Sequence, residues 1–226
     1  RALKMHGGVE KEDLKKENLD ALKKGLPNLD KHIENVKKFG LELVVAINHF
    51  ITDTNKEVQL IKDHCLKLGV KVSLCTHWSE GGKGTEDLAK NVVEVCEKNN
   101  KKKFKYLYTN EIPILKKIET IAEEIYGANG IEVDDKIKEQ IKKIEESGFG
   151  KFPICIAKTQ YSFSTDPKLK GAPAGHKLPV REVRLSSGAE FIVVICGSIM
   201  TMPGLPKIPA ADSIKLNDKG EIEGLF

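Results

Sequence analysis

The order of apolar and polar residues in the first third of the chain predicts a helix followed by a strand. Asn28 is of a residue type that caps helix N-termini, and apolar side chains recur at helical spacing from there to Gly40. Glycine commonly ends a helix, so we expect this helix to stop at Gly40. The run Leu41–Asn48 that follows is apolar and rich in β-branched residues, which indicates a buried strand.

The same pattern repeats directly downstream. Thr54 and Glu57 have the spacing of a capping box, and apolar residues then recur at helical spacing up to Gly69. Val70–Cys75 has the composition of a second buried strand, and the glycine-rich loop Ser79–Gly84 leads into another helix. Strands that alternate with helices at this spacing favour a parallel sheet with right-handed crossovers.

The second half of the chain predicts a smaller unit of mixed structure. The short run Phe104–Tyr108 and a helix over Glu111–Tyr126 complete the first unit, and the pattern changes after Gly127. Beyond it we expect a charged helix and then three strands, at Asp134–Ser147, Phe152–Thr159, Val180–Leu185 and Ala189–Cys196. The expected fold class is therefore α/β, with a parallel-sheet, Rossmann-like domain over residues 29–127 and a smaller α/β domain over residues 128–226.

Composition narrows the class of protein. Of the 226 residues, 40% are hydrophobic and 31% are charged, which provides enough apolar material for a core and excludes a disordered chain. The formal net charge of +4 is far below that of a dedicated nucleic-acid-binding protein. The longest apolar runs fall well short of the roughly 20 residues that span a bilayer. We therefore expect no nucleic-acid partner, no membrane partner and no signal peptide.

Neither the cysteines nor the histidines form a metal-binding pattern. The five cysteines include no C-x-x-C pair and each lies in an apolar stretch, so we expect buried, reduced thiols. None of the six histidines has the i, i+4 spacing of a zinc site, and we expect no metal site.

The most informative residues follow the two predicted strands of the first unit. In open α/β sheets, ligands bind outside the carboxyl ends of parallel strands. The first strand leads into Phe50 and the second into Trp78, so two aromatic rings are expected at the same edge of the sheet. They face one another across a slot for a flat heterocycle, or they cover the core beneath their loops. Position alone does not separate these two readings.

Two other segments carry a candidate function beside a structural one. The loop Glu80–Thr85 resembles a phosphate cradle, but Gly84 separates Lys83 from Thr85, so it is not a Walker A loop. A tight turn between strand and helix is the favoured interpretation. Met200–Pro206 is a rigid Pro-Gly-Pro segment directly after a predicted strand. It lines a ligand cleft or serves as a structural turn.

Ordered blocks along the whole chain resemble the formate–tetrahydrofolate ligase family. The first eight residues, Arg1–Gly8, look like the end of a family signature that continues upstream with V-A-T-[IV]. The other similar blocks are Asn28–Gly40 with the V-V-A-I-N strand, Thr52–Thr54, Trp78 to Gly82, Ile125–Ala128, Gly148–Gly150, Pro153–Thr159, Met200–Pro206 and Gly224–Phe226. The resemblance implies a ligase in which ATP phosphorylates formate and N10 of tetrahydrofolate attacks the formyl phosphate.

The resemblance also implies roles for particular residues. It implies that the folate ring system stacks between Phe50 and Trp78, with Leu74 beside them. It further implies that the Met200–Pro206 segment lies near the nucleotide and folate cleft, which makes Thr201, Pro203 and Gly204 candidate residues there. The substrates would be formate, tetrahydrofolate and ATP with Mg, and the parent enzyme would be a cytoplasmic homo-oligomer, with mitochondria as the other compartment left open.

The family's P-loop signature and the residues that hold formyl phosphate do not occur in the chain. We expect them, and the catalytic residues, upstream of Arg1, so that residues 1–28 are the remnant of a nucleotide-binding domain and the chain is part of a three-domain ligase. On this hypothesis the chain alone is inactive. The alternative is a non-catalytic interaction or scaffold module that kept the fold.

Overall fold

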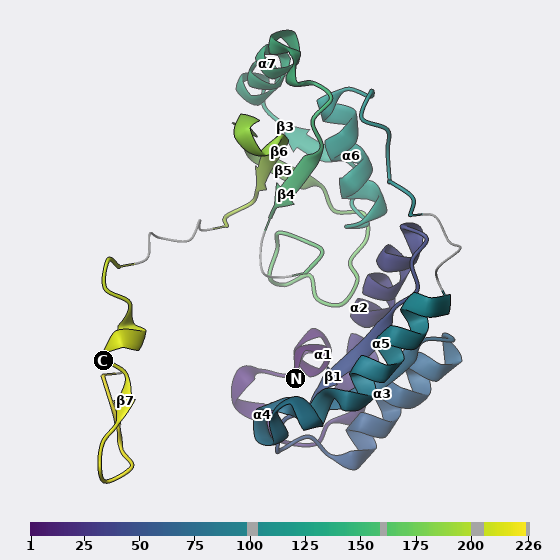
Figure 1. Cartoon of the computed structure of the whole chain (residues 1–226). Coiled ribbons are helices and arrows are strands. Elements are labelled where there is room, and N and C mark those ends of the chain that lie inside the picture. The colour runs from purple at the N-terminus through teal and green to yellow at the C-terminus, as the bar shows by residue number, and fades with distance from the viewer. Residues whose placement is uncertain (99–103, 159–161, 200–205, 225–226) are drawn as a thin grey trace.

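The computed structural model describes residues 1–98, 104–158, 162–199 and 206–224, and these form two lobes and a C-terminal segment (Figure 1). The first lobe is residues 1–98. The second lobe is residues 104–158 and 162–199. Both combine helices with parallel strand pairs, which confirms the predicted α/β fold class.

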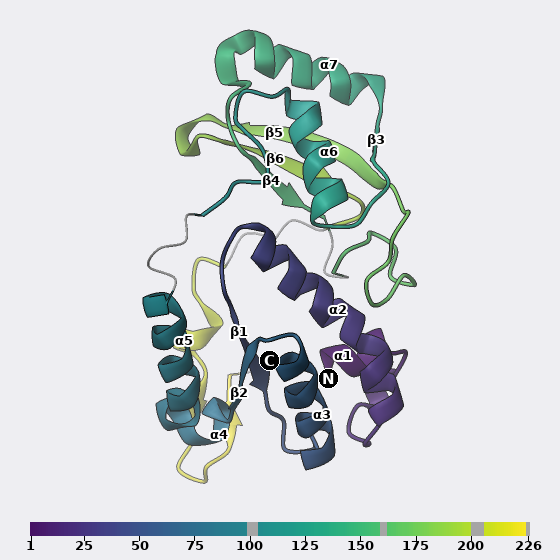
Figure 2. The same cartoon turned by 90° about the vertical axis from the view of Figure 1, so that its right-hand side faces the viewer.

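The first lobe is built around two parallel strands, β1 and β2. Its elements are α1 (Ala2–His6), a 3-10 helix (Lys11–Asp13), α2 (Leu19–Lys38), β1 (Val44–Asn48), α3 (Asn55–Lys67), β2 (Lys71–Cys75), α4 (His77–Glu80), a second 3-10 helix (Gly81–Thr85) and α5 (Glu86–Lys98). Figure 2 shows β1 and β2 between α3 and α5. The strand–helix–strand order predicted from the sequence is confirmed.

The two faces of this strand pair differ in chemistry. On one face, Ile33 of α2 and Cys65 of α3 are buried against apolar strand residues such as Val45 and Val72. On the other face, Ser73 donates a hydrogen bond to Asp87 of α5 at 2.7 Å. Polar contacts thus contribute to the packing of α5 on the sheet, and no α5 side chain is fully buried.

The predicted helix start at Asn28 is wrong. The helix begins at Leu19, where the Asn18 side chain caps it by accepting a hydrogen bond from the Ala21 amide at 2.9 Å. Leu22 and Leu26 extend the buried face upstream of Asn28, and burial of that face outweighs the local capping signal. The predicted domain limit at residue 28 thus falls inside one continuous helix.

The second lobe contains a four-stranded mixed sheet. Its elements are α6 (Ile114–Glu124), β3 (Ile131–Val133), α7 (Asp135–Ile144), a π-helical turn (Glu145–Phe149), β4 (Ile154–Ala157), β5 (Leu178–Ser186), a 3-10 helix (Ser187–Ala189) and β6 (Phe191–Cys196). The strand order is β3-β5-β6-β4, with β5 and β6 antiparallel and the two outer pairs parallel. The Asp134 side chain caps α7 by accepting from the Ile137 amide at 2.8 Å.

Helix α6 packs on this second sheet. Ile114 and Ile118 belong to the same core as Val183 and Val194 of the strands, and all four side chains are fully buried. Helical periodicity indicates which residues point inward but not which sheet they meet. A boundary near residue 127 therefore stays a prediction, while the packing favours a division before α6.

The run Phe104–Tyr108 is not a strand. The ring of Phe104 stacks on the ring of Phe39, with the two centroids 5.5 Å apart. The Lys105 amide donates a hydrogen bond to the Phe39 carbonyl at 2.9 Å. Tyr106 is largely exposed. The aromatic residues of this run pack in a cluster beside the end of α2. Their β propensity alone does not place them in a sheet, because none of the described strands pairs with them.

Helix α2 joins the two lobes. Its Asn28 side chain donates to the Ser162 hydroxyl and to the Gly171 carbonyl, both at 2.9 Å. About two turns further on, the Asn35 side chain donates to the Ile125 carbonyl at 2.9 Å. Both views show α2 lying directly beneath the second lobe (Figures 1 and 2). An asparagine that the sequence pattern suggested as a cap is thus an inter-lobe contact.

The C-terminal segment has little buried surface. It contains a 3-10 helix (Ala210–Asp212) and the antiparallel pair β7 (Lys215–Leu216) and β8 (Ile222–Glu223). Ile208, Leu216 and Ile222 are exposed.

The five cysteines are free, but two of them are exposed. Cys65, Cys75 and Cys196 are buried as predicted, whereas Cys96 and Cys155 are not. Cys96 lies on α5, which has no buried residue, and Cys155 occupies an outward position of β4, so an apolar sequence context was a poor guide to burial. None of the described helices is long and apolar enough to cross a membrane.

The packing of α6 yields a stability prediction. Replacing Ile118 with Ala leaves a cavity among fully buried residues, so the free energy of unfolding should fall by about 2–5 kcal/mol. Glu123 is an exposed residue of the same helix, and Glu123→Ala is the matched control, expected to change stability by less than about 0.5 kcal/mol. Urea denaturation measures both, and equal effects of the two changes would contradict the packing of α6 described here.

Candidate functional site

The aromatic residues singled out from the sequence lie past the carboxyl ends of two parallel strands. β1 ends at Asn48 and β2 at Cys75, and these two residues are partners in the register. The His49 amide continues the ladder by donating to the Cys75 carbonyl at 3.1 Å. Phe50 and Trp78 therefore begin from the same edge of the sheet, as predicted.

A reciprocal turn fixes the position of Phe50. The Phe50 amide donates to the Asp53 carboxylate at 2.9 Å, and the Asp53 amide donates to the Phe50 carbonyl at 2.8 Å. The capping box of α3 begins at the next residue, where the Thr54 hydroxyl accepts from the Glu57 amide at 3.3 Å. This confirms the predicted capping box, and it ties Phe50 to both the strand and the following helix.

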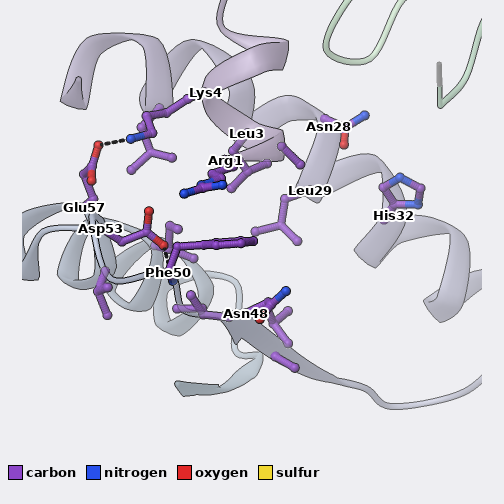
Figure 3. Close-up of a pocket in the computed structure, with 17 residues that line it drawn as sticks. Arg1, Leu3, Lys4, Asn28, Leu29, His32, Asn48, Phe50, Asp53 and Glu57 are labelled. Carbon is purple, nitrogen blue, oxygen red and sulfur yellow. Dashed lines mark hydrogen bonds and ion pairs between the residues drawn. The ribbon is translucent and has the colours of Figure 1, made fainter. Parts of the chain in front are cut away.

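Phe50 lies in the wall of a cavity of about 320 Å³ between α1, α2, β1 and the start of α3 (Figure 3). The Arg1 guanidinium carbon is 3.8 Å from the centroid of the Phe50 ring. Figure 3 shows the ring edge-on with the guanidinium above it. One face of Phe50 thus already stacks against a flat, polar group.

The rest of the cavity wall combines apolar side chains with a few polar groups. Leu29, Val45 and Ile61 contribute apolar surface, and the polar lining residues are Arg1, Lys4, Asn28, His32, Asn48, Asp53 and Glu57. Sites for small organic ligands have this composition, in which a few polar groups orient a mainly apolar contact. Burial, followed by the charge of Lys158, lowers the pKa of His32, so its ring is neutral near pH 7.

A buried ion pair lies at one end of this cavity. The Lys4 ammonium is 2.9 Å from a Glu57 carboxylate oxygen, and both side chains are almost fully buried. Burial raises the pKa of Glu57, but hydrogen bonds from Thr54, Lys4 and Asn18 outweigh it, and the pKa lies below the ordinary value. Sequence reasoning missed this pair, because the two residues are far apart in the chain and no local pattern connects them.

Trp78 and Leu74 do not line the cavity. Trp78 lies on α4, immediately after β2, and is 61% exposed. Leu74 is a half-buried residue of β2, opposite Ile47 in the register. Among the described residues, no ring contact joins Phe50 to Trp78. The slot between the two rings therefore stays a prediction.

The glycine-rich loop makes a tight turn. The Thr76 amide donates to the Gly84 carbonyl at 3.0 Å, which closes the loop that carries α4. A Cβ atom at Gly84 would lie 2.6 Å from the Thr76 carbonyl carbon and 2.7 Å from the His77 amide nitrogen. This close backbone approach accounts for Gly84, so the structure favours a turn over a phosphate cradle.

The Met200–Pro206 candidates and the buried Lys158 add little to the site. Thr201, Pro203 and Gly204 lie outside the described residues. Lys158, at the end of β4, is buried beside Tyr126, with the ammonium 5.2 Å from the ring centroid. Burial lowers its pKa to about 8. Within the described part of the chain, no three His, Cys, Asp or Glu side chains gather as metal ligands.

Comparison with known proteins gives a single family. The family model described as formate–tetrahydrofolate ligase matches residues 1–226. The formate–tetrahydrofolate ligase of Pelagibacter ubique (strain HTCC1062) is 67% identical over 226 residues, and that of Roseobacter denitrificans (strain ATCC 33942 / OCh 114) is 56% identical over 226 residues. Each match covers the whole chain and 40% of the relative, so the chain spans less than half the length of these relatives.

The turn at Gly84 yields a prediction about Trp78. Gly84→Ala forces the backbone away from Thr76 and should reduce the free energy of unfolding by about 1–3 kcal/mol. Gly82→Ala is the matched control, because a Cβ at Gly82 meets nothing within 4 Å. The fluorescence of Trp78, the one tryptophan of the chain, should shift in Gly84→Ala only. Identical spectra and stabilities for the two variants would refute the close approach.

Proposed function

The chain belongs to the formate–tetrahydrofolate ligase family, and we propose that it contributes the tetrahydrofolate-binding surface of such an enzyme. In the proposed reaction, ATP transfers its γ-phosphoryl group to formate and gives ADP and formyl phosphate. The lone pair of N10 of tetrahydrofolate then attacks the formyl carbon, phosphate leaves, and N10 loses its proton. The products are 10-formyltetrahydrofolate, ADP and phosphate.

The contact between Phe50 and Arg1 is the observation that supports this proposal best. A guanidinium is flat and polar, and it stacks on Phe50 at 3.8 Å inside a cavity open to a small molecule. A reduced pterin ring is also flat and polar, so it can take the same face when Arg1 turns aside. Trp78, exposed at the same sheet edge, is the second ring that we propose for the stack.

The polar groups around Phe50 suit the edges of such a ring. Asp53 offers carboxylate oxygens, and Asn48 offers both a donor and an acceptor. Asn28 offers its carbonyl oxygen, because its two N–H groups already donate to Ser162 and Gly171. We propose that these side chains orient the heterocycle and that the aromatic contacts hold its faces. The chain's part in the reaction is then to bind tetrahydrofolate and present N10 to formyl phosphate.

We propose that ATP with Mg binds to a part of the enzyme other than these 226 residues, because the sequence contains no Walker A pattern. Formyl phosphate forms beside that nucleotide, so the residues that stabilise phosphoryl transfer belong to the same part. We further propose that the enzyme is cytoplasmic, because the similar ligases come from bacteria, and that it is a homo-oligomer, as the family resemblance implies.

Folate binding can be tested on the chain itself. Tetrahydrofolate should quench Trp78 fluorescence in the wild-type chain, and Phe50→Ala should raise the Kd at least about tenfold by removing a stacked and buried contact. Phe104→Ala is the control, because Phe104 is an exposed aromatic residue that contacts Phe39 and not the cavity. Equal affinity in wild type and Phe50→Ala would reject stacking on Phe50. Absence of any response would favour the non-catalytic interaction module.

Turnover by the chain alone tests the proposal that ATP binds to another part of the enzyme. With ATP, Mg, formate and tetrahydrofolate, the isolated chain should form no 10-formyltetrahydrofolate above the background of a reaction without protein. The product is measured after acid conversion to 5,10-methenyltetrahydrofolate, by its absorbance. A full-length ligase of the family is the positive control. Formation of product that depends on both ATP and formate would disprove the assignment of ATP to another part.

A further inference from the structure

The buried Lys4–Glu57 pair has no spare hydrogen-bonding capacity on its cation. A lysine ammonium has three N–H donors. Those of Lys4 go to the Leu14 carbonyl at 2.7 Å, the Lys16 carbonyl at 3.1 Å and the Glu57 carboxylate at 2.9 Å. Lys4 lines the cavity, yet no donor is left for a ligand. Its role is therefore to hold other parts of the protein.

Glu57 connects three segments through its carboxylate. One oxygen accepts from Lys4 and also from the amide of Asn18 at 3.1 Å. Asn18 is the N-cap residue of α2. The other oxygen accepts from the Thr54 amide at 3.1 Å. Thr54 directly follows the reciprocal turn Phe50–Asp53. The pair thus joins α1, the start of α2 and the turn that carries Phe50.

Stability alone does not explain an ion pair in this position. Burying two charges costs desolvation free energy, and apolar residues of similar size often stabilise a protein as well or better. What apolar residues cannot supply is direction, because only hydrogen bonds fix the Thr54 and Asn18 amides at a defined distance from one point. The same carboxylate therefore sets where the turn stands relative to the wall formed by α1.

We propose that Lys4 and Glu57 are positioning residues of the folate site, which hold the Phe50–Asp53 turn in the orientation that stacks the ligand. This inference rests on the proposed function. The pair has no N–H left to donate to a ligand, and it acts on the turn through the Thr54 amide. Breaking it lets the turn move, so that Phe50 and Asp53 present their ring and carboxylate in many orientations.

The test compares two buried lysines of the same chain. Lys117 is as buried as Lys4 and donates to the Gly150 and Phe152 carbonyls at 2.7 and 3.0 Å, but it lies in the core of the second lobe. Lys4→Met and Lys117→Met should both lower the Tm. Only Lys4→Met should raise the Kd for tetrahydrofolate, by about tenfold, and speed amide hydrogen exchange over residues 50–57.

A second variant keeps the test valid if Lys4→Met does not fold. Lys4→Met leaves the Glu57 charge buried without its partner, whereas Lys4→Met with Glu57→Gln removes both charges and should fold. It too should show faster exchange over residues 50–57 and weaker folate binding. Wild-type exchange and wild-type Kd in a folded variant lacking the pair would overturn the proposal. If the wild-type chain binds no tetrahydrofolate, the proposed function fails, and the exchange data alone decide whether the pair holds the turn.

Discussion

The buried carboxylate of Glu57 holds several segments of the first lobe in place around the cavity. It accepts hydrogen bonds from Lys4, from the N-cap of α2 and from the N-cap of α3, and it does so in an almost fully buried position. A buried carboxylate is stable only when such partners surround it. The same partners place the end of β1, the turn at Phe50 and helix α1 around one cavity. The arrangement of the site thus follows from satisfying one buried charge.

Helix α2 connects this part of the first lobe to the second lobe. Its N-terminus is held by Glu57, while Asn28 and Asn35 hydrogen-bond to the second lobe further along the helix. Asn28 also lines the cavity that contains Phe50. A ligand that contacts Asn28 therefore meets a residue that joins the lobes, so α2 connects the site to the second lobe.

Local patterns in the sequence were sufficient for much of the fold. The capping box at Thr54, the two parallel strands and the placing of Phe50 and Trp78 at one sheet edge all depend on short-range spacing, and the structure has each of them. The family resemblance, which rests on ordered blocks of residues, is confirmed by the family match. Stacking of folate between Phe50 and Trp78 remains a prediction, since Trp78 lies outside the cavity.

What the sequence could not show depends on contacts between distant residues. Nothing near Lys4 identifies Glu57 as its partner, and nothing in the periodicity of α6 says that it packs on the second sheet. The start of α2 was misplaced at Asn28 because a capping residue type is common inside helices when a tertiary partner, here Ser162 and Gly171, takes up its side chain.

A crystal structure of the chain with tetrahydrofolate would show directly whether the ligand stacks on Phe50. We expect the pterin ring to lie flat against Phe50 in the cavity, at the roughly 3.5–4 Å of carbon–carbon contact, with the Arg1 guanidinium displaced from that face. The Phe50–Asp53 turn should keep its two hydrogen bonds and the Lys4–Glu57 pair should be intact. A pterin ring bound elsewhere, with Arg1 still stacked on Phe50, would contradict this expectation.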